Sequence, residues 1–265
     1  MYGGLKTLFY NGEKLWEGDE DYGDPLVYNK TERQSWQQII ILPGVQEIPD
    51  CTFTGCVKVK RIMMNDDVQL IGKATFFNCW RLVFIRLSRR LVKIGKYGFK
   101  GCYTLASLFI PRSCTEIGNK ALSSCKKLKI LCIPNENTTL GMYVIEDTAL
   151  IRSSPFEVNR DGSYNMYYDS DNSVYTDDNE AVNTWIKSSD MVGDAFSLRA
   201  ECSSEYPNME RIIERIKETG LSAMRCKNEA GISPSQVLES NPYSTIEEKK
   251  IVNNYILELM GEINA

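Results

Sequence analysis

The sequence predicts an α/β repeat protein, in which a solenoid of about five coils with a parallel ladder of short strands precedes an α-helical region. Two observations carry this prediction. The segments IGKATFFNCWRLVFIRL, from Ile71, and IGKYGFKGCYTLASLFI, from Ile94, begin 23 residues apart and align almost residue for residue. After Leu150 the repeat fades, and the chain becomes polar and acidic, then helical in its apolar spacing. A fixed period of this kind is the signature of stacked coils that bury their apolar side chains against one another.

Several columns of apolar residues keep the 23-residue interval. They are Ile39, Ile62, Ile85, Leu108 and Leu131; Ile48, Ile71, Ile94 and Ile117; Phe53, Phe76, Phe99 and Leu122; and Cys56, Cys79, Cys102 and Cys125. The first column lies in an apolar–x–x–apolar–x–apolar pattern that predicts one short parallel strand per coil. The Phe and Cys columns then belong to the return side of each coil, with their side chains in the core.

The nine cysteines are expected to be reduced and buried. An odd count and a regular spacing argue against a disulfide framework. Zinc sites usually contain cysteine pairs two to four residues apart, and the sequence has none. We therefore expect neither a metal nor a cofactor in the solenoid.

The segment IPRSCTEIGNKALSSCKKLKILCIP, from Ile110, resembles the BspA-like class of leucine-rich repeats, and the resemblance extends over residues 36–154. It implies a leucine-rich-repeat solenoid without an assigned reaction, in a class whose members are often surface or adhesion proteins. With the blocks FYNGEKLW and GISPSQVLESNP, the whole chain resembles a repeat-protein family of unicellular algae.

Residues 1–35 are predicted to cap the first coil. The segment Leu8–Glu17 alternates apolar and polar residues around Asn11-Gly12, which is a strong signal for a two-residue hairpin turn. A cap is needed because the terminal coil of a solenoid would otherwise expose its apolar face.

Residues 155–180 are predicted to form an acidic loop or linker. Its last part places acidic and hydroxyl side chains at the calcium-ligand positions of an EF-hand loop. These residues are Asp169, Asp171, Ser173, Asp177 and Glu180. The position that needs glycine for its sharp turn is Val174, so we expect an acidic, solvated loop and keep calcium as the weaker alternative.

Residues 181–265 are predicted to be helical and ankyrin-like. A helix from Pro207 to Gly220 has a proline start and a glycine stop. Ser244 and Glu247 have capping-box spacing before a last helix. The segment from Gly231 to Pro234 is similar to the start of an ankyrin repeat, and Phe196–Cys202 is similar to an earlier, degraded copy.

The strand face that points away from the core is the first candidate binding site. Its predicted contact residues are Ile40, Met63, Phe84, Arg86, Phe109 and Ile130. This face is unusually apolar, and exposed patches of that kind mark interaction sites. The alternative is that a terminal segment of the chain covers it, and the sequence leaves both open.

A basic stretch is the second candidate. From Arg81 to Ile133 the sequence has twelve Lys or Arg and one acid, and Arg89, Arg90 and Lys93 are its predicted patch. Such a patch suits an anionic partner, such as an acidic protein segment. The alternative is that these side chains are solvated or face the acidic segment of the chain itself. The net charge of −4 argues against nucleic acid.

These features predict a non-catalytic scaffold that binds a protein partner on its strand face. The sequence has no histidine, which excludes His-dependent triads, bases and metal sites. A surface or adhesion protein is the alternative, and a hydrolase that uses carboxylates alone is a remote one. No apolar run reaches 18 residues, and the N-terminal residues lack the apolar core of a secretory signal, so we expect an intracellular, cytoplasmic location.

Overall fold

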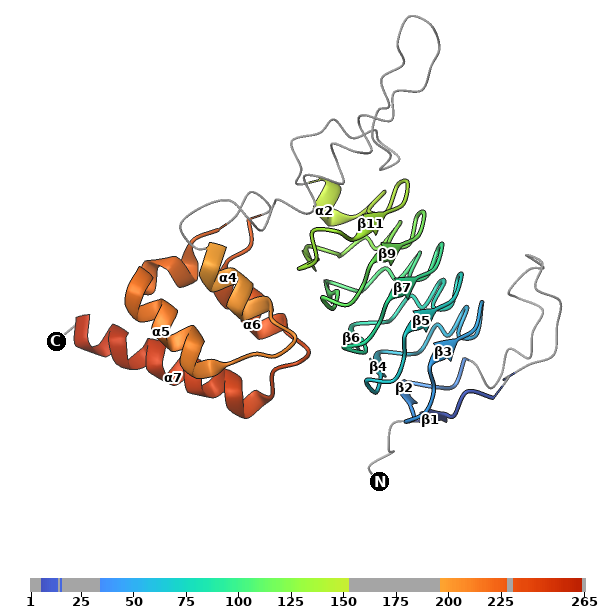
Figure 1. Cartoon of the computed structure of the whole chain (residues 1–265), viewed down its shortest axis with the longest axis horizontal. Coiled ribbons are helices and arrows are strands. Elements are labelled where there is room, and N and C mark those ends of the chain that lie inside the picture. The colour runs from blue at the N-terminus through green and yellow to red at the C-terminus, as the bar shows by residue number, and fades with distance from the viewer. Residues whose placement is uncertain (1–5, 14, 16–33, 153–195, 228–230, 264–265) are drawn as a thin grey trace, which may run out of the picture. The chain divides into compact units, whose positions relative to one another are not determined.

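The computed structural model describes residues 6–13, 15, 34–152, 196–227 and 231–263. The chain divides into two compact units, Met1–Asn183 and Thr184–Ala265. The first contains the strands and the second the longer helices (Figure 1).

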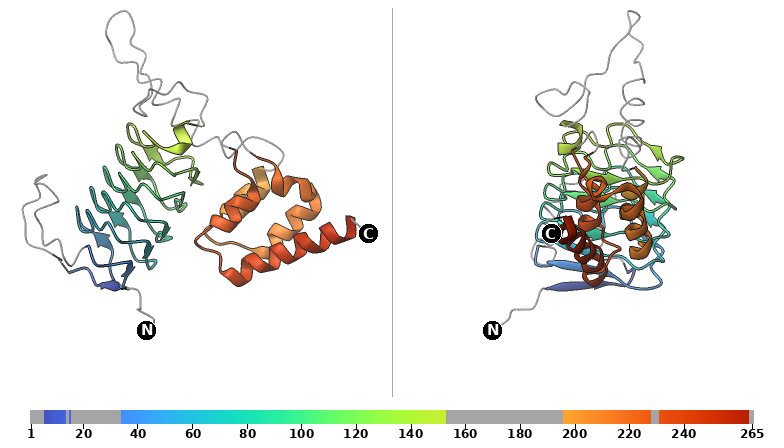
Figure 2. Two further views of the ribbon diagram at one scale, coloured as in Figure 1. Left: turned by 180° about the vertical axis from the view of Figure 1, so that it is seen from behind. Right: turned by 90° about the vertical axis from the view of Figure 1, so that its left-hand side faces the viewer.

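Two parallel ladders run along the first unit, and their strands recur every 23 residues (Figures 1 and 2). The strands of the first ladder are β2 (Gln38–Ile41), β4 (Arg61–Met63), β6 (Phe84–Arg86), β8 (Ser107–Phe109) and β10 (Ile130–Cys132). The strands of the second are β3 (Glu47–Ile48), β5 (Leu70–Ile71), β7 (Lys93–Ile94), β9 (Glu116–Ile117) and β11 (Thr139–Leu140). The predicted solenoid of parallel coils is confirmed.

The second ladder was not predicted, because the sequence indicated one strand per coil. Each of its strands is two residues long, with one outward residue followed by a buried isoleucine or leucine. In the first ladder the predicted register holds: Ile39 pairs with Ile62, and Ile62 with Ile85. Backbone pairing of the first ladder is continuous from β2 to β6 and resumes between β8 and β10.

The return side of the coils is built on the Phe and Cys columns. Phe53, Phe76 and Phe99 are fully buried and stack with centroid distances of 5.5 and 5.1 Å. The thiol of Cys102 donates a hydrogen bond to the carbonyl oxygen of Phe76 in the preceding coil, at 3.3 Å. Cys79 and Cys125 likewise donate to the phenylalanine carbonyl of the coil that precedes each of them. Each of these three phenylalanine carbonyls also accepts a backbone N–H, so the thiol adds a second, weak donor from the next coil. Alanine at these positions would have no donor.

A glycine column sets how closely the coils approach. Its members are Gly72, Gly95, Gly118 and Gly141. A Cβ atom on Gly95 would lie 2.6 Å from the carbonyl carbon of Gly72, and one on Gly118 would lie 2.6 Å from the backbone nitrogen of Lys96. Real Cβ atoms do not approach backbone so closely, so glycine here is required by stacking.

The N-terminal strand has a pairing that the sequence did not predict. β1 (Thr7–Tyr10) pairs in parallel with β2 and thereby extends the first ladder. Tyr10 continues the aromatic column, because its ring meets Phe53 edge-on at 5.1 Å. The second arm of the predicted hairpin lies largely outside the described residues, as does most of the predicted 155–180 loop.

The last coil is followed by the short helix α2 (Ala149–Arg152). The second unit contains α4 (Phe196–Ser203), α5 (Met209–Thr219), the 3-10 helix η1 (Leu221–Arg225), α6 (Pro234–Ser240) and α7 (Ile246–Ile263). α4 packs against α5 and α6, and α5 packs against α7. The predicted helix from Pro207 is confirmed as α5, and it buries Met209, Ile212 and Ile216.

The caps of these helices explain where they begin. Asn208 accepts a hydrogen bond from the backbone of Arg211 at the start of α5. The capping box of α7 lies one residue later than predicted, because the reciprocal bonds join Thr245 and Glu248 instead of Ser244 and Glu247. The ankyrin-like description of this unit stays a prediction.

Candidate protein-interaction surface

The outward face of the first ladder carries the predicted apolar contact residues. Strand alternation buries Ile39 and Ile62 and turns Ile40, Met63 and Phe84 outward, where each is half-buried. Ile40 and Met63 are direct cross-strand neighbours. Phe84 lies in the next strand opposite Arg61, two residues away from Arg86, which is the direct partner of Met63. Ile40, Met63 and Phe84 thus lie on one outward face in three successive coils, and we call them the strand-face cluster.

Two residues predicted on this face, Phe109 and Ile130, do not join the strand-face cluster. Phe109 is only 2% exposed, so the prediction that it offers a contact surface is wrong in this structure. Ile130 is half-buried, but it lies in β10 beside Ser107, away from the other apolar contacts. Phe84 also has a covered ring face, because the Arg61 guanidinium lies 4.5 Å from its centroid. The usable apolar surface is therefore smaller than the sequence indicated.

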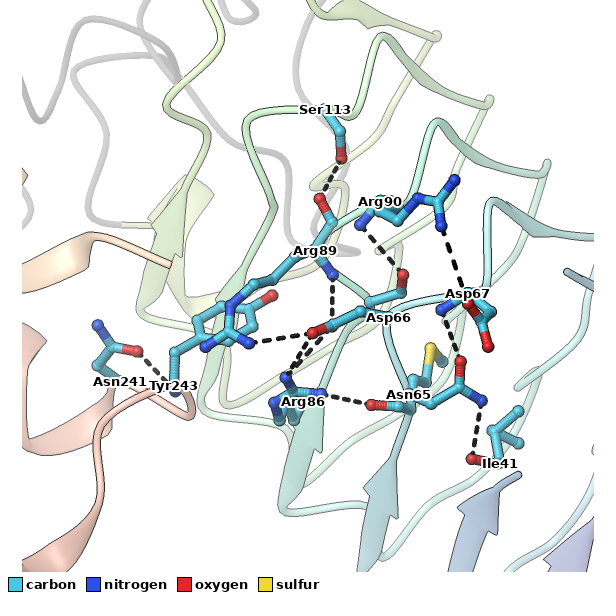
Figure 3. Close-up of polar contacts among 12 residues, drawn as sticks. Ile41, Asn65, Asp66, Asp67, Arg86, Arg89, Arg90, Ser113, Asn241 and Tyr243 are labelled. Carbon is cyan, nitrogen blue, oxygen red and sulfur yellow. Dashed lines mark hydrogen bonds and ion pairs between the residues drawn. The ribbon is translucent and has the colours of Figure 1, made fainter. Parts of the chain in front are cut away.

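A charged network borders the strand-face cluster, and Asp66 is its centre (Figure 3). Arg86 and Arg89 both form ion pairs with the Asp66 carboxylate, at 3.2 and 3.0 Å. The backbone N–H of Arg89 donates to the same carboxylate at 3.0 Å. Arg86 also donates to the carbonyl oxygen of Met64. Arg86 is thus held in place by acceptors on the preceding coil.

The pKa of Asp66 reflects this arrangement. Partial burial acts to raise the pKa of the carboxyl, but the hydrogen bond from the Arg89 backbone and the charges of Arg86 and Arg89 outweigh it. The net pKa lies below its usual value, so Asp66 is a carboxylate at neutral pH and neutralises part of the basic stretch.

The comparisons with known proteins concern this same stack of coils. Residues 31–154 match the family model of the BspA type leucine rich repeat region, in six copies. The solenoid therefore resembles a BspA-type leucine-rich repeat region, and the match covers a little under half of the chain. Leucine-rich repeats of this class typically take part in protein–protein interaction or surface adhesion, and they generally serve as non-enzymatic scaffolds.

Solved bacterial structures are similar to parts of the chain. A leucine-rich repeat protein from T. pallidum is 29% identical over 40% of this chain and 51% of its own, with a TM-score of 0.38. One from Bacteroides ovatus is 32% identical over 44% of this chain and 30% of its own, with a TM-score of 0.42. The chain thus spans about half of the first structure and less than a third of the second. Among curated proteins, none matches the chain.

The predicted basic patch of the BspA-type repeats is largely paired. Arg89 contacts Asp66, Arg90 lies 3.8 Å from Asp67, and Lys93 lies 2.8 Å from Glu116. In each pair the partners are 23 residues apart, so they occupy the same place in adjacent coils. The sequence contained this signal: in a solenoid, residues one period apart are neighbours, and opposite charges at that interval pair. These ion pairs neutralise part of the predicted basic patch, so its role in binding an anionic partner stays a prediction.

No group of three or more metal-ligating side chains occurs among the described residues. The calcium candidate, Asp169–Glu180, lies outside them. Within the same described part of the chain, no helix is both long and apolar enough to span a membrane.

Proposed function

We propose that the chain is a non-catalytic scaffold that binds a protein partner on the outward face of the first strand ladder. The observation that carries this proposal is the strand-face cluster of Ile40, Met63 and Phe84, three half-buried apolar residues from three adjacent coils. Apolar and aromatic side chains grouped at the centre of a face supply most of the binding energy in protein interfaces.

The rigidity of the scaffold supports the same proposal. Parallel pairing, stacked phenylalanines and inter-coil hydrogen bonds fix the spacing of successive coils. A partner that binds this face therefore pays little for ordering it, which improves affinity without additional contacts. The Asp66 network adds a polar rim, with Arg86 oriented beside the apolar group.

We also propose that the protein works inside the cell, in the cytoplasm. All nine cysteines are free thiols, and eight of them are buried or half-buried. Thiols remain reduced in the cytosol, whereas proteins of oxidising compartments usually form disulfides. Cell fractionation with antibody detection tests this location, and recovery in the secreted or surface fraction would favour the adhesion alternative.

The experiment that tests the binding face compares two lysine substitutions in the same coil. Met63→Lys changes the outward face of the first ladder, and Leu70→Lys changes the outward face of the second, where Leu70 is also half-buried. Both variants carry the same added charge. Quantitative affinity purification should lose a specific partner with Met63→Lys and keep it with Leu70→Lys. Equal retention by both folded variants, confirmed by circular dichroism, would contradict the proposal.

A further inference from the structure

A surface of the solenoid that adjoins the strand-face cluster carries mostly unpaired positive charge. It consists of the four residues before a strand of the first ladder together with the first residue of that strand, in four successive coils: 57–61, 80–84, 103–107 and 126–130. These segments contain no Asp or Glu. Their basic residues, all exposed, are Lys58, Lys60, Arg61, Arg81, Lys126, Lys127 and Lys129. We call these seven residues, with the aromatic and apolar side chains between them, the basic corner.

The basic corner differs from the predicted patch in its pairing. In the predicted patch, each cation has an acid one period away. In the basic corner, the residue one period from Lys58 is Arg81, and the residue one period from Lys60 is Val83. Among the described residues, this surface has one ion pair, that of Lys126 with Asp147 at 3.8 Å. Its positive charge is therefore available to a ligand.

The centre of the basic corner is aromatic and apolar. Trp80 is 46% exposed, Tyr103 38% and Val83 55%, although large apolar side chains are mostly covered elsewhere in the solenoid. Trp80 and Tyr103 occupy the same place in adjacent coils and stack at 6.2 Å with an interplanar angle of 13°. Basic residues lie on both sides of this pair along the stack: Lys58 and Lys60 one coil before Trp80, and Lys126 and Lys127 one coil after Tyr103.

We propose that the basic corner binds an acidic peptide segment of a partner protein, with an apolar residue of that segment against Trp80 and Tyr103. Lys58 and Lys127 lie three coils apart, or about 14 Å at the usual spacing of about 4.8 Å between parallel strands. An extended peptide covers that distance in about four residues. The segment therefore needs carboxylates on both sides of one or two apolar residues. This inference rests on the proposed protein-binding function but uses an adjoining surface, which shares Phe84 with the strand-face cluster and excludes Ile40 and Met63.

The ring geometry favours a peptide over a nucleic acid. Bases bind single-strand sites by stacking on open aromatic faces. Trp80 and Tyr103 use one face each for the other, and the ammonium group of Lys126 lies 5.5 Å from the Tyr103 centroid. Phe84 has Arg61 over its ring. Each of these rings thus has at least one face occupied, and cations surround them, which is the pattern of a protein interface with an apolar centre.

The test is a binding titration of the full chain with a fluorescein-labelled peptide, Glu-Glu-Asp-Leu-Trp-Asp-Glu-Glu, followed by fluorescence anisotropy. We expect binding that weakens with salt. The corner variant Arg81→Glu/Lys127→Glu should bind about tenfold or more weakly, and Trp80→Ala several-fold more weakly. The control Lys96→Glu/Lys100→Glu has the same net charge as the corner variant and should stay within about twofold of the wild type.

Other occupants are separate outcomes of the same titration. If the corner and control variants lost the same peptide affinity, the binding would depend only on the net charge of the protein, and the proposal would be overturned. Corner-dependent binding of phosphatidylserine vesicles or of a thymidine oligonucleotide, without peptide binding, would also overturn it. So would peptide binding that appears only after Asp169, Asp171, Asp177 and Asp178 are replaced by Asn, because the chain itself would then supply the ligand. Met63→Lys should bind the peptide normally, which separates this proposal from the strand-face proposal.

Discussion

Asp66 and Arg89 are one period apart in the sequence and in direct contact in the fold. The Arg89 backbone N–H and its guanidinium each donate to the Asp66 carboxylate at 3.0 Å. The same interval relates Asp67 to Arg90 and Lys93 to Glu116. Whether a charged side chain in this solenoid forms an ion pair therefore depends on the residues 23 positions before and after it.

Replacing Asp66 tests this pairing through the pH dependence of stability. The pKa of Asp66 is lowered in the fold from its ordinary value of 3.8. A lowered carboxyl pKa contributes stability that is present above the ordinary value and is lost as the pH falls through the folded value. We expect Asp66→Asn to lower the free energy of unfolding by about 0.5–1 kcal/mol at pH 7, since the pair is partly exposed.

Urea unfolding of the wild type and Asp66→Asn between pH 7 and strongly acidic pH measures this effect. The difference between the two proteins should shrink as the pH falls below about 4. Asp50→Asn is a comparison in the same unit without an ion pair among the described contacts. A difference that stays constant down to the lowest pH would contradict a lowered pKa for Asp66.

The buried cysteines should react slowly with thiol reagents in the folded protein. Burial raises the pKa of the Cys102 thiol well above its ordinary value, and it raises the pKa of Cys114 to about 11 and of Cys202 to about 12. Thiol reagents attack the thiolate, so these groups react slowly at pH 8. We expect about two reactive thiols in the native protein, Cys226 first and Cys51 more slowly, since these two are the least buried.

An Ellman titration before and after denaturation measures the count. All nine thiols should react in denaturant. Removing Cys226 by Cys226→Ser should abolish the fast phase and leave the melting temperature unchanged. Rapid reaction of five or more thiols in the folded protein would show that the column is open to solvent.

The glycine column makes a prediction about packing. In Gly95→Ala the new methyl group would lie 2.6 Å from the carbonyl carbon of Gly72, where backbone has to move. We expect a loss of about 1–3 kcal/mol in the free energy of unfolding, as for other overpacked sites. Lys96→Ala, at the exposed neighbouring position, should change it by less than about 0.5 kcal/mol. Equal melting temperatures for the two variants in thermal unfolding would refute the close approach.

A buried amide organises the helical unit. Asn241 is fully buried, and its side chain donates to the carbonyl oxygens of Cys202 and Ser204 at 2.9 and 2.8 Å. Its side-chain amide oxygen accepts a hydrogen bond from the backbone N–H of Tyr243 at 2.8 Å. We expect Asn241→Ala to destabilise this unit by about 1–3 kcal/mol, because three backbone groups lose their partner. The loss of helical circular dichroism in urea measures it, with Ser240→Ala as the control, and an unchanged midpoint would contradict this role.

Much of the first unit could be predicted because a solenoid repeats its contacts. The Ile39, Phe53 and Cys56 columns each gave several copies of one signal, and the structure buries all of them. The second ladder escaped prediction because a strand of two residues, such as Leu70–Ile71, has no alternation to detect. The N-terminal turn signal at Asn11-Gly12 was local, whereas the pairing of β1 with β2 depends on residues about 30 positions away.

The candidate site was predicted less well, because exposure and pairing depend on neighbouring coils. Phe109 occupies an outward strand position but is buried, which alternation alone does not indicate. Counting charges along the chain selected Arg89 and Lys93, which have acidic neighbours. It left Lys58 outside the basic stretch and counted Lys127 without selecting it, although the neighbours of both one period away are not acids. Comparing charges at the 23-residue interval would have separated the two groups.

The most direct test of the proposed scaffold is photo-cross-linking in cells that express the protein with p-benzoylphenylalanine at position 63 or at position 70. These positions are half-buried, belong to the same coil and lie on the two different ladders. We expect a discrete cross-linked partner from position 63 and none of the same mass from position 70. The same adduct from both positions, or one from position 70 alone, would contradict binding on the strand face.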